Sequence, residues 1–317
     1  MWVQIFTDTD MSTAYLTHPL CEEHKLGEDH PESPQRLEAI QNRLIAGQLM
    51  DFMRWREANE VTVEQLNATH DPNYVASIFA KAPEQGHVEL DQETLMMPNT
   101  LDAALRASGA VVQAVDMIMG GEVQNAFCAV RPPGHHAEYD KAMGFCLFNN
   151  IAVGARHALN QYGIERIAIV DFDVHHGNGT EDIFKNDPRV LYASSYQHPL
   201  FPYPDPGASH DNIIHMPLEK GSKGEDFRAA YESELFPALE AFKPQLLMIS
   251  AGFDALAEDP MGQLRLREDD IVWVTEKLME VAERHCEGRV VSVLEGGYNT
   301  DALGRAVFSH LKAMMAL

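Results

Sequence analysis

Apolar runs alternate with amphipathic stretches along most of this 317-residue chain. Short apolar runs bounded by turn residues predict buried strands, over residues 126–130, 167–170, 190–194, 246–250 and 290–294. Apolar residues recur at helical spacing between them, which predicts amphipathic helices over 100–119, 151–162, 225–241 and 268–285. This alternation is typical of an α/β fold with a parallel sheet and helices on both faces.

The chain shows no linker, low-complexity tract or internal repeat, so we expect a single domain over residues 1–317. Residues 1–10 are a candidate N-terminal extension, because Met11 offers an alternative start. We interpret residues 22–36 and 198–209 as ordered surface loops.

Polar, glycine-flanked residues follow four of the predicted strands. They form the segments RPPGHHA (131–137), DFDVHHGNG (171–179), AGFD (251–254) and EGGYN (295–299). In open parallel sheets, ligands bind beyond the carboxyl ends of the strands, so we expect these segments to converge on one crevice. If the second segment continues its strand, then Asp171, Asp173 and His175 share one face. Three metal-capable side chains would then leave one strand end together.

Composition narrows the function classes. A hydrophobic content of 45% and a charged content of 23% are ordinary for a soluble protein. No apolar run approaches the ~20 residues needed to span a bilayer. The start of the chain lacks the features of a signal peptide, and the four cysteines form no CxxC pair, so we expect reduced thiols in the cytoplasm. A net charge of −24 argues against a nucleic-acid partner, because phosphate binding requires a basic surface.

The motif set resembles the histone deacetylase superfamily, in particular its class II-like and bacterial amidohydrolase members. The resemblance rests on RPPGHHA (131–137), GFC (144–146), DFDVHHGNGT (171–180), GFDA (252–255) and EGGYN (295–299), and it extends from about His18 to about His310. It implies the arginase/deacetylase fold, with a mainly parallel sheet of about eight strands and helices on both faces. It also implies a Zn²⁺-dependent hydrolase of N-acyl amides.

By this resemblance, Asp173, His175 and Asp254 are the metal ligands. Three protein ligands leave coordination positions open for water and a substrate carbonyl, as a catalytic zinc site requires. Because the set is rich in oxygen, ligand type alone leaves Fe²⁺ and Mn²⁺ open.

The resemblance also assigns the proton-transfer groups. His136 is implied to be the general base and acid, and His135 to orient water and stabilise charge. Asp171 is implied to accept a hydrogen bond from His135, and Asn178 to be the partner of His136. Asn at position 178 is typical of class II-like members, and we expect a lower His136 pKa than with a carboxylate there. Tyr298 is implied to donate its hydroxyl to the oxyanion.

The same resemblance outlines a substrate channel. Phe145 and Phe201 match two aromatic residues that enclose a linear acyl-lysine-like chain, and Gly144 lines the same tunnel. Met261 falls at the rim position where polyamine-selective relatives carry an acidic residue, which weakens an acetylpolyamine hypothesis. Tyr196 departs from the histidine expected in many bacterial relatives.

Further cation sites follow from the resemblance or from spacing. A monovalent cation, K⁺, is implied behind the zinc site, and a second one at the periphery. The first set comprises Asp171, Asp173, His175 and Ser194, and the second comprises Phe184, Asp187 and Val190. The spacing of His18, Cys21, His24 and His30 suggests another metal site. The resemblance instead favours a loop near the entrance of the active site, and we adopt that interpretation.

These observations predict a cytoplasmic zinc-dependent deacetylase or deacylase. Its substrate would be an N-acyl amide, above all an N-acetyl amide, of a lysine-like or small amine. The alternatives are an acetylpolyamine amidohydrolase, a catalytically weak acyl-ligand-binding protein on the same scaffold, and a two-metal hydrolase of the arginase type. The sequence leaves the natural substrate and a homo-oligomer open.

Overall fold

A sheet of eight strands in the order β2-β1-β5-β10-β9-β6-β7-β8 forms the centre of the protein, and all its neighbouring strands pair in parallel. The structure is a computed structural model that describes residues 13–27, 29–207 and 210–317, so the candidate N-terminal extension and Met11 lie outside the described residues. The strands are β1 Thr13–Thr17, β2 Arg54–Glu57, β5 Asn125–Cys128, β6 Ile167–Asp171, β7 Val190–Gln197, β8 Ile213–Leu218, β9 Leu246–Ala251 and β10 Val290–Leu294. The prediction of a parallel α/β sheet is confirmed.

The five predicted strands lie inside this sheet, together with β1. All residues of β5, β6, β7, β9 and β10 are buried, which explains their apolar sequences. The sequence analysis missed β1, β2 and β8. Strands β2 and β8 are the sheet edges, where burial alternates or is interrupted, so their sequences carry a weaker apolar signal.

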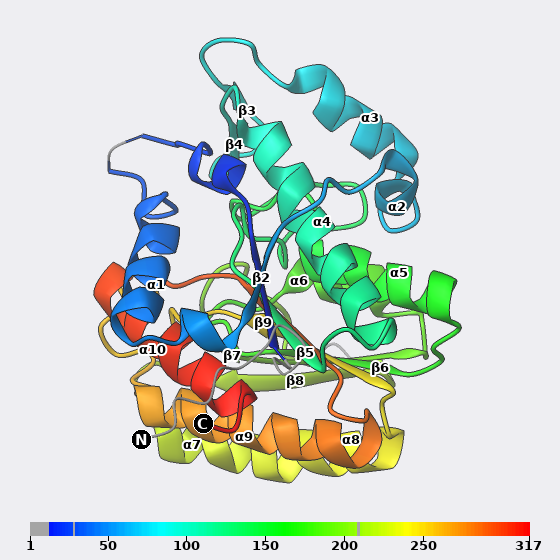
Figure 1. Cartoon of the computed structure of the whole chain (residues 1–317), viewed down its shortest axis with the longest axis vertical. Helices are drawn as coiled ribbons and strands as arrows, with labels where there is room; N and C mark the ends of the chain where they lie inside the picture. Colours follow the sequence, from blue (N-terminus) through cyan, green and yellow to red (C-terminus); the bar gives the residue numbers. More distant parts are fainter. Residues whose placement is uncertain (1–12, 28, 208–209) are drawn as a thin grey trace.

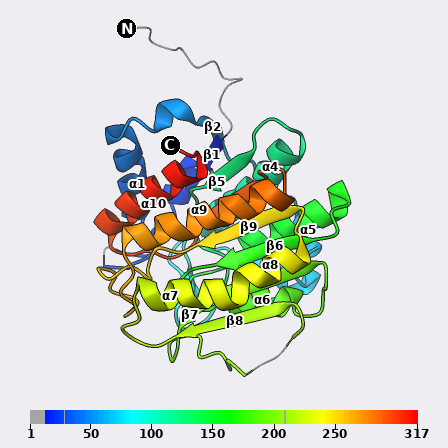
Figure 2. The same ribbon diagram turned by 90° about the horizontal axis from the view of Figure 1, so that it is seen from below.

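Helices cover both faces of the sheet, as expected. Figures 1 and 2 show α4 and α5 on one face and α7, α8 and α9 on the other, while α10 packs between α9 and α1. The α-helices are α1 Gln35–Ala46, α2 Val63–Asn67, α3 Pro72–Lys81, α4 Thr100–Met119, α5 Asn150–Tyr162, α6 Asn178–Phe184, α7 Gly224–Ala230, α8 Phe236–Phe242, α9 Glu268–His285 and α10 Thr300–Met314. The predicted helix over 225–241 is α7 and α8 joined by a π-helical segment, Tyr231–Leu235.

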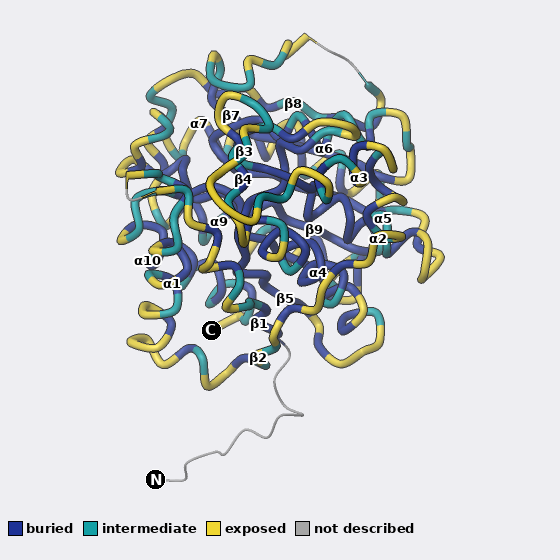
Figure 3. Tube along the Cα trace, turned by 90° about the horizontal axis from the view of Figure 1, so that it is seen from above, coloured by how far each residue is buried: buried dark blue, intermediate teal, exposed yellow. Residues whose placement is uncertain are grey.

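Short elements complete the fold: the 3₁₀ turns Pro19–Glu22 and Met50–Phe52, and the antiparallel pair β3 Val88–Glu89 and β4 Leu95–Met96. The interior strands are the most deeply buried part of the molecule, and exposed residues gather in the loops around them (Figure 3). No helix in the described ranges combines the length and apolar character that a bilayer span requires. All four cysteines are free and buried, in agreement with the expected thiols.

The parallel register brings polar strand ends to one edge. Asp171, the last residue of β6, lies opposite Ser194 of β7 and Ser250 of β9. Leu294, the last residue of β10, pairs with Ala251 at the end of β9. The four polar segments of the sequence therefore leave the sheet side by side.

The segment over residues 22–36 is not the surface loop that we expected. It carries His24, Glu32 and Arg36, which are fully buried. The buried charges of Glu32 and Arg36 require partners, which are described with the site below.

Candidate active site

Three side chains with metal-binding donors converge at the carboxyl edge of the sheet. His175 Nδ1 lies 3.0 Å from Asp173 Oδ1 and 3.2 Å from Asp254 Oδ2. We call Asp173, His175 and Asp254 the front cluster. All three are buried, and Asp254 Oδ2 has no hydrogen bond of good geometry. A buried carboxylate oxygen without a hydrogen bond is costly, so this donor set fits a bound cation.

The front cluster is built on turns and not on an extended strand. Strand β6 ends at Asp171, whose Oδ1 accepts a hydrogen bond from Asp173 N at 3.1 Å. Asp173 Oδ1 in turn accepts from His175 N at 2.8 Å. These two side-chain-to-backbone bonds curl the chain. The expectation that Asp171, Asp173 and His175 share one strand face is therefore wrong, and only the last two join the cluster.

Two glycines let the carboxylates approach the backbone. A Cβ at Gly252 would collide with the carboxylate of Asp173, and one at Gly296 would collide with that of Asp254. Because Gly296 has no side chain, its N–H can also approach Asp173 and donate to Asp173 Oδ2 at 2.8 Å. The glycines that follow β9 and β10 thus serve close packing against the ligand groups.

The charges of the front cluster favour a positive occupant. Burial raises the pKa of Asp254 to about 7, and the neighbouring charge of Asp173 adds to this. Burial alone would lower the pKa of His175, but hydrogen bonds to Asp173 and Asp254 raise it to about 10. The imidazolium of the metal-free chain thus neutralises part of a negative site. A divalent cation would supply this positive charge instead, and the His175 imidazole would then be neutral and able to bind the metal.

The two consecutive histidines lie beside the front cluster with opposite charge preferences. Their ring centroids are 4.0 Å apart. Burial opposes a charged His135, but the carboxylates of Asp171 and Asp173 raise its pKa to about 10. Burial and the positive charges of His135 and His175 hold the pKa of His136 well below its usual value. His136 is therefore the neutral member of the pair at pH 7.

Each of these histidines has a fixed partner. His135 Nδ1 lies 2.9 Å from Asp171 Oδ2, which also accepts from the Tyr192 hydroxyl at 2.9 Å. His136 Nδ1 lies 2.8 Å from Asn178 Oδ1. Both pairings are those that the resemblance implied. Tyr192 was not singled out from the sequence, because a tyrosine within a buried strand gives no functional signal.

Tyr298 lies at the same edge, in the turn after β10. Its backbone N–H donates to Asp259 Oδ2 at 2.6 Å, and the Arg36 guanidinium carbon lies 4.9 Å from the centre of its ring. Burial raises the pKa of the Tyr298 hydroxyl well above its usual value, with Asp254 and Asp173 contributing through their charges. The hydroxyl therefore keeps its proton and can act as a donor.

Aromatic rings flank these groups. The Phe201 ring centroid lies 5.1 Å from that of His136, and the Phe145 ring centroid lies 6.2 Å from that of Tyr298. Gly144 adopts φ 55°, and a Cβ there would meet the His136 ring. Met261 is half-buried and its N–H donates to Asp259 Oδ1 at 2.9 Å. Asp259 thus ties the turn of Met261 to that of Tyr298, a link invisible in the sequence.

The residues of the two implied monovalent-cation sites also gather. Ser194 is buried beside Asp171, and its hydroxyl has no hydrogen-bond partner. At the periphery, the Asn212 side-chain N–H₂ lies 2.8 to 3.1 Å from the carbonyls of Phe184, Asp187 and Val190. These carbonyls converge as expected but already have a donor from within the chain. Both cation sites stay predictions.

A buried ion cluster stands behind the active site and was missed in the sequence. Both Arg131 Nε and Arg131 Nη2 lie 2.5 Å from the carboxylate of Glu32, and Arg36 Nη1 lies 3.1 Å from it. Arg36 also donates to the carbonyls of Glu295 and Gly297 at 2.5 and 2.7 Å. The cluster therefore joins the 22–36 segment to the turn that carries Tyr298.

Glu295 is a second buried carboxylate without an assigned role. It accepts hydrogen bonds from the backbone N–H groups of Gly134 and His135, at 2.8 and 3.1 Å, and from Ser250 Oγ at 3.1 Å. Burial raises its pKa to about 7. Glu295 therefore holds the backbone at the point where the two consecutive histidines begin. Its position directly after β10 is the sequence signal that could have identified it.

The spacing of His18, Cys21, His24 and His30 does not produce a metal site among the described residues. His18 Nδ1 accepts from Leu20 N, His24 Nδ1 lies 2.7 Å from Thr100 Oγ1, and His30 Nδ1 accepts from Glu32 N. Cys21 is buried. This agrees with the interpretation of the segment as a loop, although a partly buried one.

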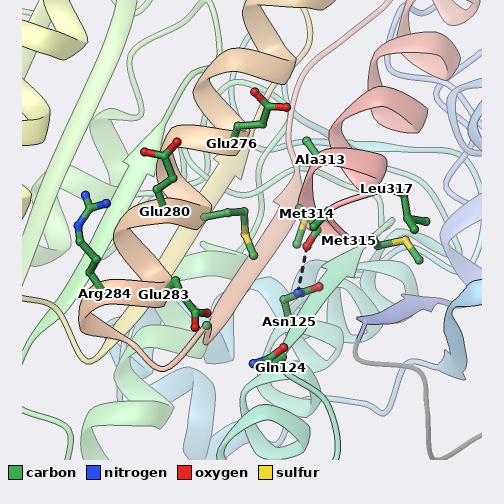
Figure 4. Close-up of a pocket in the computed structure, with 13 residues that line it drawn as sticks. Gln124, Asn125, Glu276, Glu280, Glu283, Arg284, Ala313, Met314, Met315 and Leu317 are labelled. Atoms are coloured by element: carbon green, nitrogen blue, oxygen red, sulfur yellow. Dashed lines mark hydrogen bonds between the residues drawn. The ribbon is translucent and has the colours of Figure 1, made fainter.

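A cavity of about 760 Å³ lies at the opposite, amino-terminal ends of β5 and β10. Figure 4 shows acidic residues of α9 on one side of it, and the end of α10 with the last residues of the chain on the other. None of the predicted site residues lines this cavity. This cavity therefore plays no part in the chemistry that the sequence indicates.

Comparison with known proteins identifies close relatives. Residues 30–314 match the histone deacetylase domain. Type-2 histone deacetylase 2 of Dictyostelium discoideum is 35% identical over 354 residues, which cover 96% of this chain and 21% of that protein. The histone deacetylase-like amidohydrolase of Pseudomonas aeruginosa is 36% identical over 280 residues, which cover 85% of this chain and 73% of that protein. This chain thus spans about a fifth of the first relative and nearly three quarters of the second.

A solved structure agrees with these matches. The crystal structure of the HDA15 HD domain superposes with a TM-score of 0.90 at 32% identity, and the match covers 96% of this chain and 88% of that one. The expected arginase/deacetylase fold is consistent with this neighbour.

Proposed function

The chain belongs to the histone deacetylase family and is a hydrolase of amide bonds, and from this premise we propose that it is a zinc-dependent deacetylase or deacylase. Its substrate is an N-acyl amide, above all an N-acetyl amide, of a lysine-like or small amine. The products are a carboxylate and the free amine.

One observation carries this proposal: the front cluster lies beside a neutral histidine. Asp173, His175 and Asp254 offer two carboxylates and one imidazole within 4.8 Å of one another. The pKa of His136 is held well below its usual value, so this imidazole is neutral at pH 7. When bound there, Zn²⁺ would polarise the amide carbonyl and lower the pKa of water. The oxygen-rich set also suits Fe²⁺ or Mn²⁺, which metal analysis would reveal.

Two hydrogen bonds support Nε2 as the basic nitrogen of His136. Asn178 Nδ2 donates to Glu138 Oε1 at 2.7 Å, which orients the amide so that Asn178 Oδ1 faces His136 Nδ1. An amide oxygen accepts, so Nδ1 of His136 carries the proton and Nε2 is the free base. His136 Nε2 takes a proton from the attacking water and returns it to the leaving amine.

His135 and Tyr298 stabilise charge. The Asp171 carboxylate holds the Nδ1–H of His135 and favours its charged form, so His135 presents a positive group beside the reacting atoms. The Tyr298 hydroxyl, which retains its proton, donates to the oxyanion that forms from the amide carbonyl.

The rings of Phe145 and Phe201 favour a narrow, linear substrate. They lie against Tyr298 and His136, so a chain between them would bring its acyl end to the front cluster. Gly144 has no Cβ, so the His136 ring can lie directly against its backbone. Met261 offers no carboxylate to a second ammonium group, which favours acyl-lysine-like substrates over acetylpolyamines.

The other candidate functions have less support. Among the residues that the structure describes, the metal-capable groups are the front cluster and one separate group, and they share no ligand. A two-metal cluster of the arginase type needs shared ligands. A catalytically weak acyl-binding protein would not need the His136–Asn178–Glu138 chain.

A substrate panel tests the proposal. Zinc-loaded protein is assayed with acetyl-lysine peptides, longer acyl-lysines, N-acetyl monoamines and acetylpolyamines, with release of the free amine as the readout. We expect hydrolysis of acetyl-lysine-type substrates and weaker hydrolysis of acetylpolyamines. The Met261→Glu variant should shift the ratio toward acetylpolyamines. Binding of acyl-lysine without turnover on any substrate would contradict the assignment as an enzyme and favour the acyl-binding alternative.

A further inference from the structure

A second group of metal-capable side chains lies behind the first. His176 Nε2 lies 2.6 Å from Glu181 Oε2, and His215 Nε2 lies 3.4 Å from the same oxygen. We call His176, Glu181 and His215 the rear cluster. We propose that the rear cluster binds a second transition-metal ion of the Zn²⁺ class, which joins strand β8 to the active-site loop. This inference goes beyond the proposed catalytic function and does not depend on it.

The donor set and its burial support a metal. The three donor atoms lie within 4.8 Å of one another, and their side chains are 1%, 15% and 7% exposed in the order His176, Glu181 and His215. Two imidazoles and one carboxylate form a set that is typical of protein-bound zinc. His215 Nε2 is buried and makes no hydrogen bond of good geometry, although it points toward Glu181. A metal ion would give this nitrogen a partner.

The rear cluster has groups that orient its ligands. The Tyr196 hydroxyl lies 3.1 Å from His215 Nδ1, the ring nitrogen opposite the donor atom. The His176 ring packs at centroid distances of 4.8 Å from Tyr196 and 6.1 Å from Tyr192. Metal-binding histidines are usually fixed by a hydrogen bond from the other nitrogen, and Tyr196 supplies that bond for His215. His176 Nδ1 has no hydrogen-bond partner, so the His176 ring is held by packing. This gives a role to Tyr196, the residue that departs from the expected family pattern.

A solvent-accessible and acidic pocket leads to the rear cluster. A cavity of about 210 Å³ is lined by Glu181 and His215 together with Glu138, Asp182 and Asp205. Lys185 also lines it, but its ammonium group is paired with Asp182 at 2.9 Å. The pocket is therefore net negative and can admit a cation with the water that completes its coordination.

The ligands come from three elements, which gives the metal a structural effect. His176 lies in the loop after β6, Glu181 on α6, and His215 on the edge strand β8. A metal ion bound to all three would hold the sheet edge against the loop that carries His175. The competing explanation is a metal-free network in which Glu181 accepts hydrogen bonds from both imidazoles.

Metal stoichiometry separates these two explanations. Protein stripped with a chelator is reloaded with Zn²⁺, freed of unbound metal and measured by ICP-MS. We expect two zinc ions per chain in the wild type, and one each in Asp254→Asn and His215→Asn. His87→Asn, a change at an exposed histidine, should keep two. A wild type with one zinc ion, together with unchanged zinc content in His215→Asn, would overturn the proposal.

A spectroscopic measurement covers the case in which a variant folds poorly. Co²⁺ added to Asp254→Asn should give visible absorption from the rear cluster alone, and the additional change Glu181→Gln should abolish it. Zn²⁺ should also raise the Tm of Asp254→Asn by a few degrees, and not that of the double variant. Absence of both effects in Asp254→Asn, with native circular dichroism, would contradict a rear metal site. Zinc content, Co²⁺ absorption and Tm do not depend on turnover, so failure of the catalytic proposal would leave these metal readouts unaffected.

Discussion

His175 and His176 are adjacent in the sequence, yet they belong to clusters with opposite charge balance. The front cluster combines one imidazole with two carboxylates, and the rear cluster combines two imidazoles with one carboxylate. Hydrogen bonds to the carboxylates raise the pKa of His175, whereas burial lowers that of His176 despite its bond to Glu181. The front cluster therefore requires a positive charge to balance its two carboxylates. In the rear cluster, the two imidazoles can donate hydrogen bonds to the single carboxylate, so less charge is left unbalanced.

The loop that carries both histidines can therefore serve two purposes. A buried site with excess negative charge is costly without a cation, so its metal should be held tightly. A site whose ligands can hydrogen bond to one another loses less free energy when its metal leaves. We therefore expect a chelator to remove metal from the rear cluster before the front cluster.

Replacing a front ligand should produce the largest effect. Asp254→Asn removes one of two buried carboxylates that face His175, so we expect loss of the front metal and of essentially all turnover. Zinc analysis and an acetyl-lysine assay check this. Asp211→Asn, a change at an exposed carboxylate, is the matched control and should behave as wild type. Normal zinc content in Asp254→Asn would remove Asp254 from the ligand list.

Removing the base should lower turnover while leaving the metal in place. His136→Ala deletes the neutral imidazole beside the front cluster, and the loss of a general base typically reduces the rate by about 10²–10⁴-fold. Turnover and zinc content measured on the same sample test this. If the zinc were lost with the activity, His136 would belong to the metal site and not to proton transfer.

Removing the oxyanion donor should have a somewhat smaller effect. Tyr298→Phe keeps the ring that packs against Phe145 and Arg36 but loses the hydroxyl. We expect turnover to fall by about 10²–10³-fold with zinc retained. Tyr203→Phe, at a tyrosine that is 72% exposed, provides the control. Unchanged turnover in Tyr298→Phe would show that the oxyanion has another donor.

A third buried carboxylate, Glu32, shows how the chain stabilises such a charge without metal. Burial opposes its ionisation, but Arg131, His24 and Arg36 lower its pKa from 4.5 to about 2. Because the folded-state pKa is depressed, Glu32 contributes stability above pH 4.5, and this contribution is lost as the pH falls toward 2. Glu32→Gln should therefore destabilise the fold by about 3 kcal/mol at pH 7.

Chemical denaturation at pH 7 and pH 3 measures this contribution. The variant should lose less stability than the wild type over that interval. Glu84→Gln, at an exposed glutamate, should leave both values unchanged. Equal acid sensitivity of Glu32→Gln and wild type would show that the buried arginines are neutralised in another way. Zinc content should not change, since no metal is involved.

The sequence predicted the front cluster but not the rear cluster, because all three front residues lie in short motifs next to strongly patterned strands. Asp173, His175 and Asp254 stand in short motifs directly after buried strands, so their convergence follows from the parallel sheet. His215 lies within the edge strand β8, whose burial is interrupted and whose apolar pattern is weak. Nothing in the sequence near His215 indicates that it will face His176 and Glu181.

Long-range charge pairing was equally hidden. Glu32 and Arg131 are separated by 99 positions, and composition alone makes each a typical surface residue. The same limit explains the wrong expectation for the strand face of Asp171, since alternation holds only while a chain stays extended. The hydrogen bond from Asp173 N to the Asp171 side chain ends that extension.

The glycines at 252 and 296 carry a consequence for protein engineering. Neither residue contributes a donor atom, yet a methyl group at either position would occupy the space of a ligand carboxylate. A designer who grafted only the three front ligands onto another scaffold would transfer the chemistry without the room that it needs. The minimal portable unit of the front cluster is therefore five residues, two of which act by having no side chain.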